Sequence, residues 1–280
     1  MTISEVREVY PDGDTLFILR HSGAAFATGG FEDEWSNSLP EYQTEESKCY
    51  ESSMRLEIPQ SHEYETICNH SSYAQAKPEP LHLRFKLSST VLIDTSSYFK
   101  KSLSNDWNTI EPEPGYKWTL VANDWDGEAF FLLMSILHNK PQYVPRKIEL
   151  EMLAKVAVLV DYYGCHEVVQ PWVERWLLNS YIAMVEPYYS RELLLKMMIS
   201  WVFSDRNLFR HVTEIAIRTS RGPIHTLGLP IPKTVVDTIE GRQLEFQLPA
   251  NANPAGSKNI VMFSSIKPAP GPTDGWGPGN

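Results

Sequence analysis

Alternating apolar and polar residues in the segment 81–88 predict a half-buried β-strand. Four apolar side chains fall on one face and four polar side chains on the other: Leu81, Leu83, Phe85 and Leu87 against His82, Arg84, Lys86 and Ser88. The first face is expected to be buried.

Helical spacing begins almost directly after this strand. Ser88 or Ser89 is placed to cap a helix by accepting a hydrogen bond from its free N–H groups. Four residues, each about one turn from the next, predict a single buried face for that helix: Leu92, Ser96, Phe99 and Leu103.

Further elements flank this strand and helix. Apolar runs at residues 15–20 and 116–122 predict two more strands, and Asp126 is expected to cap a helix at residues 128–139. Residues 148–164 are apolar around most of the helix circumference, which predicts the central buried helix, with Gly164 just after its end.

The remainder of the chain is dominated by helical patterns. A helix at residues 166–179 is expected to hold Pro171 in its first turn, where the missing N–H costs nothing. Three more helices are predicted, at residues 191–203, 206–220 and 232–240. Because strands and helices do not alternate regularly, we predict an α+β fold: a small, mainly three-stranded sheet packed against a helical cluster, followed by extra C-terminal helices.

The charge is concentrated in one stretch. The chain of 280 residues has a formal net charge of −10, and residues 31–80 hold 11 acidic and 3 basic side chains. This stretch is polar and aperiodic, so it predicts a mobile acidic insertion, and the Pro- and Gly-rich residues 248–280 predict a disordered tail. Without a basic patch, nucleic-acid binding is not expected.

Cysteine usage and hydropathy favour an intracellular protein, in the nucleus or the cytoplasm. Three scattered cysteines do not form a disulfide framework. No signal peptide is expected at the N-terminus, and no apolar run is long enough to predict a membrane span.

Three groups of residues are candidates for chemistry, and each also has a purely structural interpretation. Cys49, His62, Cys68 and His70 could bind zinc, but no paired C-x₂-C is present, so they are more simply polar loop residues. The stretch "NDWDGE" at 123–128 resembles the start of a calcium loop, but it lacks the Glu at the twelfth position and better fits helix capping. Cys165 beside His166 is expected to be a buried core cysteine.

We therefore expect no metal, no cofactor and no enzymatic activity, with an enzyme of unrecognised type as the alternative.

Four blocks of sequence together resemble the BTB/POZ domain. They are "GDTLFIL" (13–19), "FKLSSTVLIDTSSYFKKSL" (85–103), "DWDGEAFFLLMSILHNK" (124–140) and "IELEMLAKVAVLVDYYGCHEVVQPWVERWL" (148–177). Within the second block the family pattern falls on Phe85, Val91, Leu92, Ser96, Tyr98 and Phe99. The amino-acid sequence of the last block most resembles that of BTB proteins from filamentous fungi.

The resemblance implies a domain organisation and a function. A tail at 1–11 would precede a BTB/POZ-like domain at 12–180, interrupted by the acidic insertion at about 31–80. A helical extension at 181–247 and the tail at 248–280 would follow. Such domains are protein–protein interaction modules that self-associate, recruit partners or act as substrate adaptors of cullin-type ubiquitin ligases.

The resemblance also implies three positions for partner binding. Asp14 matches an Asp of the family's first strand, but Ser88 and Ser89 replace the basic residues that often pair with it. Trp107 and Thr109 align with the apolar and Glu positions of the element used against cullins, so the Glu is absent. We therefore expect weak or absent cullin binding.

Overall fold

The structure, a computed structural model, describes residues 6–23, 25–28, 82–104, 110–178 and 185–247. All of these residues belong to one unit, which consists of Met1–Phe31 and Pro80–Asn280. The second unit, Glu32–Glu79, lies outside the described residues. The expectation of a mobile acidic insertion and a disordered tail therefore falls on residues that are not described.

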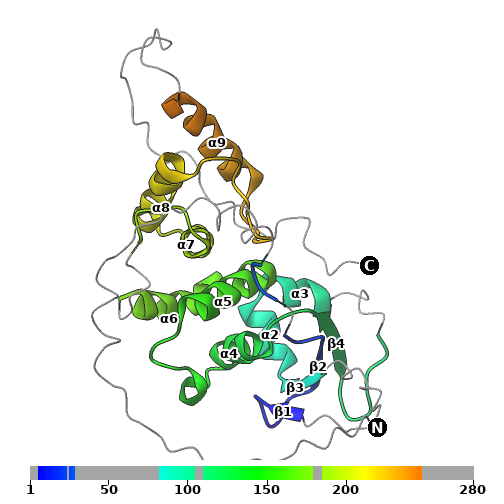
Figure 1. Ribbon diagram of the computed structural model, residues 1–280. Helices are drawn as coiled ribbons and strands as arrows, with labels where there is room; N and C mark the ends of the chain where they lie inside the picture. Colours follow the sequence, from blue (N-terminus) through cyan, green and yellow to red (C-terminus); the bar gives the residue numbers. More distant parts are fainter. Residues whose placement is uncertain (1–5, 24, 29–81, 105–109, 179–184, 248–280) are drawn as a thin grey trace, which may run out of the picture. The chain divides into compact units, whose positions relative to one another are not determined.

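The described residues form four strands, eight α-helices and one 3₁₀-helix (Figure 1). The strands are β1 (Val6–Glu8), β2 (Thr15–Arg20), β3 (Leu83–Leu87) and β4 (Trp118–Asn123). The helices are α2 (Ser89–Thr95), α3 (Ser97–Ser104), α4 (Gly127–Leu137), η2 (Pro141–Tyr143), α5 (Leu150–Tyr163), α6 (His166–Leu178), α7 (Arg191–Val202), α8 (Arg206–Thr219) and α9 (Lys233–Gln247).

The strands form one mixed sheet in the order β1-β3-β2-β4. β2 pairs antiparallel with β3 and parallel with β4, so that Phe17 lies opposite both Phe85 and Leu120. β1 pairs parallel with β3 and adds a fourth strand to the mainly three-stranded sheet that was expected. The fold is α+β, as predicted.

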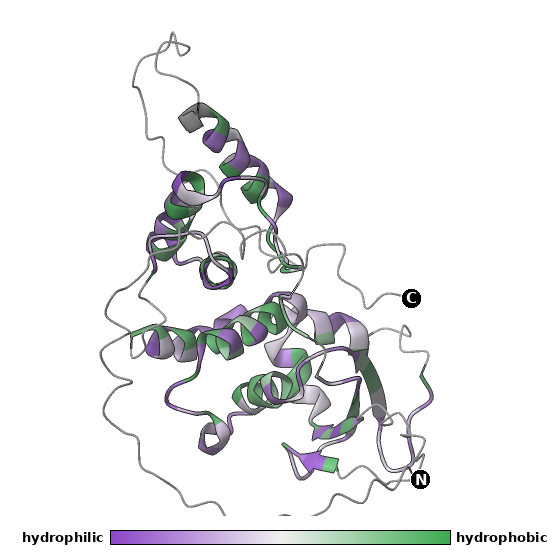
Figure 2. Cartoon of the chain, viewed as in Figure 1, coloured by the Kyte–Doolittle hydropathy of each residue, from purple (hydrophilic) through white to green (hydrophobic). Residues whose placement is uncertain are grey.

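One face of the sheet carries the aromatic core. Phe85 and Leu87 are buried, as the alternating pattern predicts. Leu83 is only half-buried, and Leu81 lies outside the described residues. The ring of Phe130 in α4 packs 4.4 Å from that of Phe17 and 5.0 Å from that of Phe85, measured between centroids. Figure 2 shows the hydrophobic residues of α4 and α5 gathered in this region.

Local signals place the ends of α4 and α5. The Asp126 carboxylate accepts hydrogen bonds from the N–H groups of Glu128 and Ala129, which confirms the predicted cap. α5 ends at Gly164, whose φ of 60° lies in the left-handed region that glycine adopts without strain. A Cβ on this residue would also clash with Ser97 Oγ.

The helix predicted after β3 is instead two helices. Ser96 adopts an extended conformation between α2 and α3, and its Oγ donates to Tyr163 O at 2.6 Å while accepting from Phe99 N–H at 3.2 Å. Ser96 therefore caps α3 and ties it to α5. Leu92, Ser96, Phe99 and Leu103 are all buried, so the predicted face is right although the helix is not continuous.

Pro171 lies inside α6, beyond its first turn, so this part of the prediction is wrong. The proline removes the N–H that would donate to the carbonyl of Glu167. Both residues are exposed, so water can bond to that carbonyl and the break is tolerated.

The C-terminal helices pack in sequence order. α7 is buried over nine of its twelve residues, because it contacts α5 on one side and α8 on the other. α9 packs on α8, where the Gln243 amide donates to Ser220 Oγ. Within the described parts of the chain, every helix is too short or too polar to span a lipid bilayer.

Candidate functional site

Asp14 holds the junction between β3 and α2. Its carboxylate accepts from the Ser89 backbone N–H at 2.8 Å and from Ser89 Oγ at 2.7 Å. Thr15 Oγ1 lies 3.2 Å from the same carboxylate. The Ser88 side chain, by contrast, makes no capping hydrogen bond. The cap expected from a local serine is thus supplied by the neighbouring strand.

Asp14 is therefore engaged inside the domain. Burial opposes ionisation of its carboxyl group, but the hydrogen bonds from Ser89 and Thr15 outweigh that effect and lower its pKa. The carboxylate that the resemblance assigns to partner pairing serves here to connect β2 with α2. Its partner is a serine rather than a basic side chain.

His138 holds the same junction from the other side. Its Nε2 accepts from the Ser88 backbone N–H at 3.0 Å, and its Nδ1–H donates to Met134 O at 2.8 Å. Burial lowers the pKa of this imidazole, as does the nearby charge of Lys140, so it is neutral at pH 7. The abrupt change from strand to helix is thus fixed by Asp14 and His138, which lie far apart in the sequence.

Two of the three predicted partner-binding residues, Trp107 and Thr109, lie outside the described residues. So do the zinc candidates Cys49, His62, Cys68 and His70. Among the residues that the structure does describe, no three His, Cys, Asp or Glu side chains are grouped as metal ligands would be.

The largest cavity described is a groove of about 1030 Å³ bordered by three junctions between helices. Its walls are residues 93–97 between α2 and α3, residues 164–168 between α5 and α6, and residues 202–204 at the end of α7. Charged side chains of both signs line it, and all four are exposed: Asp94, Lys100, Lys101 and Glu167. The groove therefore offers backbone turns and opposite charges on one surface.

Cys165 and His166 lie in this groove but do not form a nucleophile and its base. Cys165 is buried, which raises the pKa of its thiol to about 12, so the sulfur stays protonated at neutral pH. Burial lowers the pKa of His166, whose Nε2 lies 3.9 Å from Asp161 Oδ1. The prediction of a buried core cysteine is confirmed.

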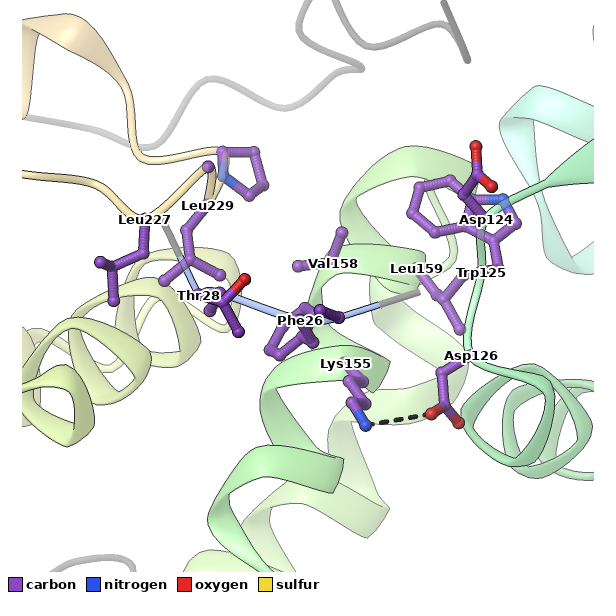
Figure 3. A pocket seen from close by; sticks show the side chains of 14 residues that line it. Phe26, Thr28, Asp124, Trp125, Asp126, Lys155, Val158, Leu159, Leu227 and Leu229 are labelled. Atoms are coloured by element: carbon purple, nitrogen blue, oxygen red, sulfur yellow. Dashed lines mark hydrogen bonds and ion pairs between the residues drawn. The ribbon is translucent and has the colours of Figure 1, made fainter. Parts of the chain in front are cut away.

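A smaller pocket of about 290 Å³ lies beside α5 (Figure 3). Figure 3 shows Leu227 and Leu229 on one side of it and Trp125 on the other. Lys155 Nζ lies 3.0 Å from Asp126 Oδ2, and Asp126 also caps α4. The pocket is thus mainly apolar, and its Lys155 and Asp126 side chains pair with each other.

The Lys155–Asp126 ion pair is part of a larger network of ion pairs that reaches α7. Lys155 also pairs with Glu151 at 3.0 Å, and Arg191 pairs with Glu151 at 2.8 Å. Arg191 further donates to the carbonyl oxygens of Phe26 and Ala27. Burial opposes the charge on Lys155, but hydrogen bonds to Asp126 and Glu151 outweigh it and raise its pKa. This network fastens the segment after β2 to α5 and α7.

Sequence reasoning missed this network. Glu151 and Lys155 lie four residues apart on α5, a spacing that indicates an ion pair on one helix face. The partners Asp126 and Arg191 carry no such signal, because they approach α5 only through the tertiary fold.

Comparison with known proteins gives no relative for this chain: no family model matches it, and neither does any curated protein.

Proposed function

We propose that this protein is a non-enzymatic protein–protein interaction module built on a BTB/POZ-like domain, which self-associates or recruits a partner. The observation that carries this proposal is the groove of about 1030 Å³ between the α2–α3, α5–α6 and α7–α8 junctions. Its exposed charges of both signs suit a polypeptide surface. The thiol on its wall is protonated, so it does not supply a nucleophile.

The packing of the four resembling blocks supports the BTB/POZ-like assignment. Each block contributes at least one buried ring to a single core, and four of these rings are Phe17, Phe85, Phe130 and Tyr163. Phe99, from the second block, stacks on Tyr163 of the fourth at 4.8 Å between centroids. Segments far apart in the sequence thus meet through the residues that carry the resemblance.

Sedimentation velocity across a wide concentration range tests self-association. We expect a concentration-dependent dimer that is weakened by the charge reversal Glu167→Lys in the groove. Glu192→Lys is the matched control, because Glu192 is also exposed and also lies in the first turn of its helix, α7. A monomer at every concentration, or equal effects of both variants, would remove the groove as a self-association surface.

Titration with a cullin N-terminal segment tests the adaptor function. Wild type is expected to bind weakly, because Thr109 cannot replace a Glu that accepts hydrogen bonds. Loss of about 1–2 kcal/mol corresponds to roughly five- to thirty-fold weaker binding. Thr109→Glu should tighten the complex and Trp107→Ala should weaken it. Tight wild-type binding that neither substitution changes would place any cullin contact on another surface.

A further inference from the structure

A third cavity, of about 160 Å³, is lined mainly by aromatic rings from β2, α3, α5 and the connection after β4. Phe17, Phe99 and Tyr163 are fully buried and form its inner part. Tyr98, Trp125 and Tyr162 are only half-buried. The outer three rings therefore reach solvent, whereas the inner three belong to the core.

The outer rings stand at steep angles to one another. Tyr98 and Tyr162 lie 5.1 Å apart between centroids and 40° apart in plane, and Trp125 and Tyr162 lie 5.2 Å and 63° apart. Tyr98 is nearly perpendicular to Tyr163, at 84°. The cavity is thus bounded by ring faces and edges that point in several directions.

Contacts between neighbouring rings hold the wall in place. Tyr162 packs 4.9 Å from Tyr163 and Tyr98 packs 5.4 Å from Phe99, measured between centroids. An incoming ligand meets a wall that is already ordered, so little side-chain entropy is lost on binding.

None of the lining residues carries a formal charge at neutral pH. Burial raises the pKa of the Tyr162 and Tyr163 phenols, which keeps them neutral. A compact, strongly hydrated ion would lose its water here without gaining a charged partner. The negative faces of aromatic rings attract a bulky, weakly hydrated cation instead.

The size of the cavity agrees with such a ligand. A cavity of about 160 Å³ holds the volume of about five water molecules, enough for a nitrogen and its methyl groups.

We propose that this aromatic cavity binds a methylated ammonium group, either the head of a small quaternary ammonium compound or a trimethylated lysine side chain of another protein. The site is separate from the groove, so failure of this proposal leaves the self-association test above unaffected.

Isothermal titration calorimetry on the full chain separates a cation site from a merely apolar one. The probes are choline and 3,3-dimethyl-1-butanol, which have the same shape but differ in charge. Choline is expected to bind at least about five-fold more tightly, as ring–cation attraction of 1 kcal/mol or more implies. Equal binding of the two compounds would overturn the proposal.

Variants locate the binding. Trp125→Leu is expected to weaken choline binding about five- to thirty-fold, because it removes one ring face. Trp118→Leu is the matched control: Trp118 is half-buried on β4 but does not line the cavity. If Trp125→Leu fails to fold by circular dichroism, Tyr98→Leu removes another wall, and Tyr98→Phe retains the ring. A loss as large in Trp118→Leu as in the cavity variants would overturn the assignment.

Peptides distinguish the two sources of the cation. A fluorescent peptide with one trimethyllysine among glycine and serine residues is compared with the same peptide carrying unmodified lysine. Preference for the trimethylated peptide over both the lysine peptide and free choline supports a protein partner. Binding of choline alone supports a small-molecule ligand. If neither choline nor the trimethylated peptide binds, the proposal is wrong.

Discussion

The aromatic core under the sheet and the C-terminal helices are built from different side chains. In the first region, rings from β2, β3, α3, α4 and α5 contact one another in a continuous chain. In the second, α7 buries mainly leucine, methionine and isoleucine, and Trp201–Phe209 is the ring contact described between α7 and α8. Rings pack in few arrangements, whereas Leu and Met adapt their shape. The packing of the aromatic core therefore constrains residue identity more tightly, and the four blocks that resemble a known domain lie in that region.

Phe85→Ala, in the aromatic core, is expected to cause the largest loss of stability. Phe85 is fully buried against Phe130, so the cost is expected to be about 3–5 kcal/mol in the free energy of unfolding, measured by urea denaturation. Arg84→Ala is the control on the opposite face. Arg84 is half-buried and pairs with Glu113, so its loss should cost about 1 kcal/mol or less. Equal costs would contradict the strand register.

Arg191→Ala tests how the two regions are joined. This side chain bonds Glu151 and the carbonyl oxygens of Phe26 and Ala27, so we expect a loss of about 1–3 kcal/mol. Differential scanning calorimetry should then show the helical region unfolding before the aromatic core. Arg191→Lys keeps the charge but not the forked geometry, and should fall between wild type and Arg191→Ala. A single unchanged transition in Arg191→Ala would show that apolar packing between α5 and α7 joins the regions without this network.

Asp14→Ala removes the polar link at the β3–α2 junction and should cost about 1–2 kcal/mol at pH 7. Asp14→Asn should cost less, because its carbonyl oxygen still accepts one hydrogen bond.

The same link has a definite dependence on pH. The pKa of Asp14 is lower in the folded chain than in the unfolded one, so the unfolded state takes up the proton first. The stability from this group is present above about pH 4, the unfolded value, and is lost as pH falls through the folded pKa. Wild type should therefore lose more stability on acidification than Asp14→Ala. Parallel acid profiles of the two proteins would contradict this role.

Met198→Leu, in α7, should have the smallest effect on stability, and it is compared with a substitution in the aromatic core. Met198 is fully buried in α7, yet a volume-conserving exchange is expected to cost less than about 1.5 kcal/mol. Phe99→Leu, at a buried ring of the aromatic core, should cost clearly more because it removes the stacking on Tyr163. Thermal unfolding of both variants checks the order, and the reverse order would show that the two regions do not differ in this way.

Local patterns predicted the features that depend on neighbouring residues. Asp126 caps α4 and Gly164 ends α5 as expected, because both signals act within a few residues. β1 was missed because a three-residue strand has too short a pattern to read, and its place is set by backbone pairing with β3. The α2 cap was assigned to a serine because the actual acceptor, Asp14, lies just before β2 and is distant in sequence.

The candidate sites were harder to predict for the same physical reason. The groove is formed by three junctions between helices, and the aromatic cavity by β2, α3, β4, α5 and the β4–α4 connection. Tyr98, Trp125 and Tyr162 have no common spacing in the sequence. Trp107 and Thr109 rest on the resemblance alone and stay predictions.

The pairing of β2 with β3 and β4 has a consequence for how the chain folds. Both partners of β2 are distant in sequence, since β3 follows the whole acidic segment and β4 follows α3. By contrast, α4 contacts α5, α7 contacts α8 and α8 contacts α9 across short connections. Because local contacts form faster than distant ones, we expect helical pairs to assemble early and the sheet to close last. Refolding should thus pass through a species with unpaired strand edges, the stage at which dilution protects the chain from aggregation.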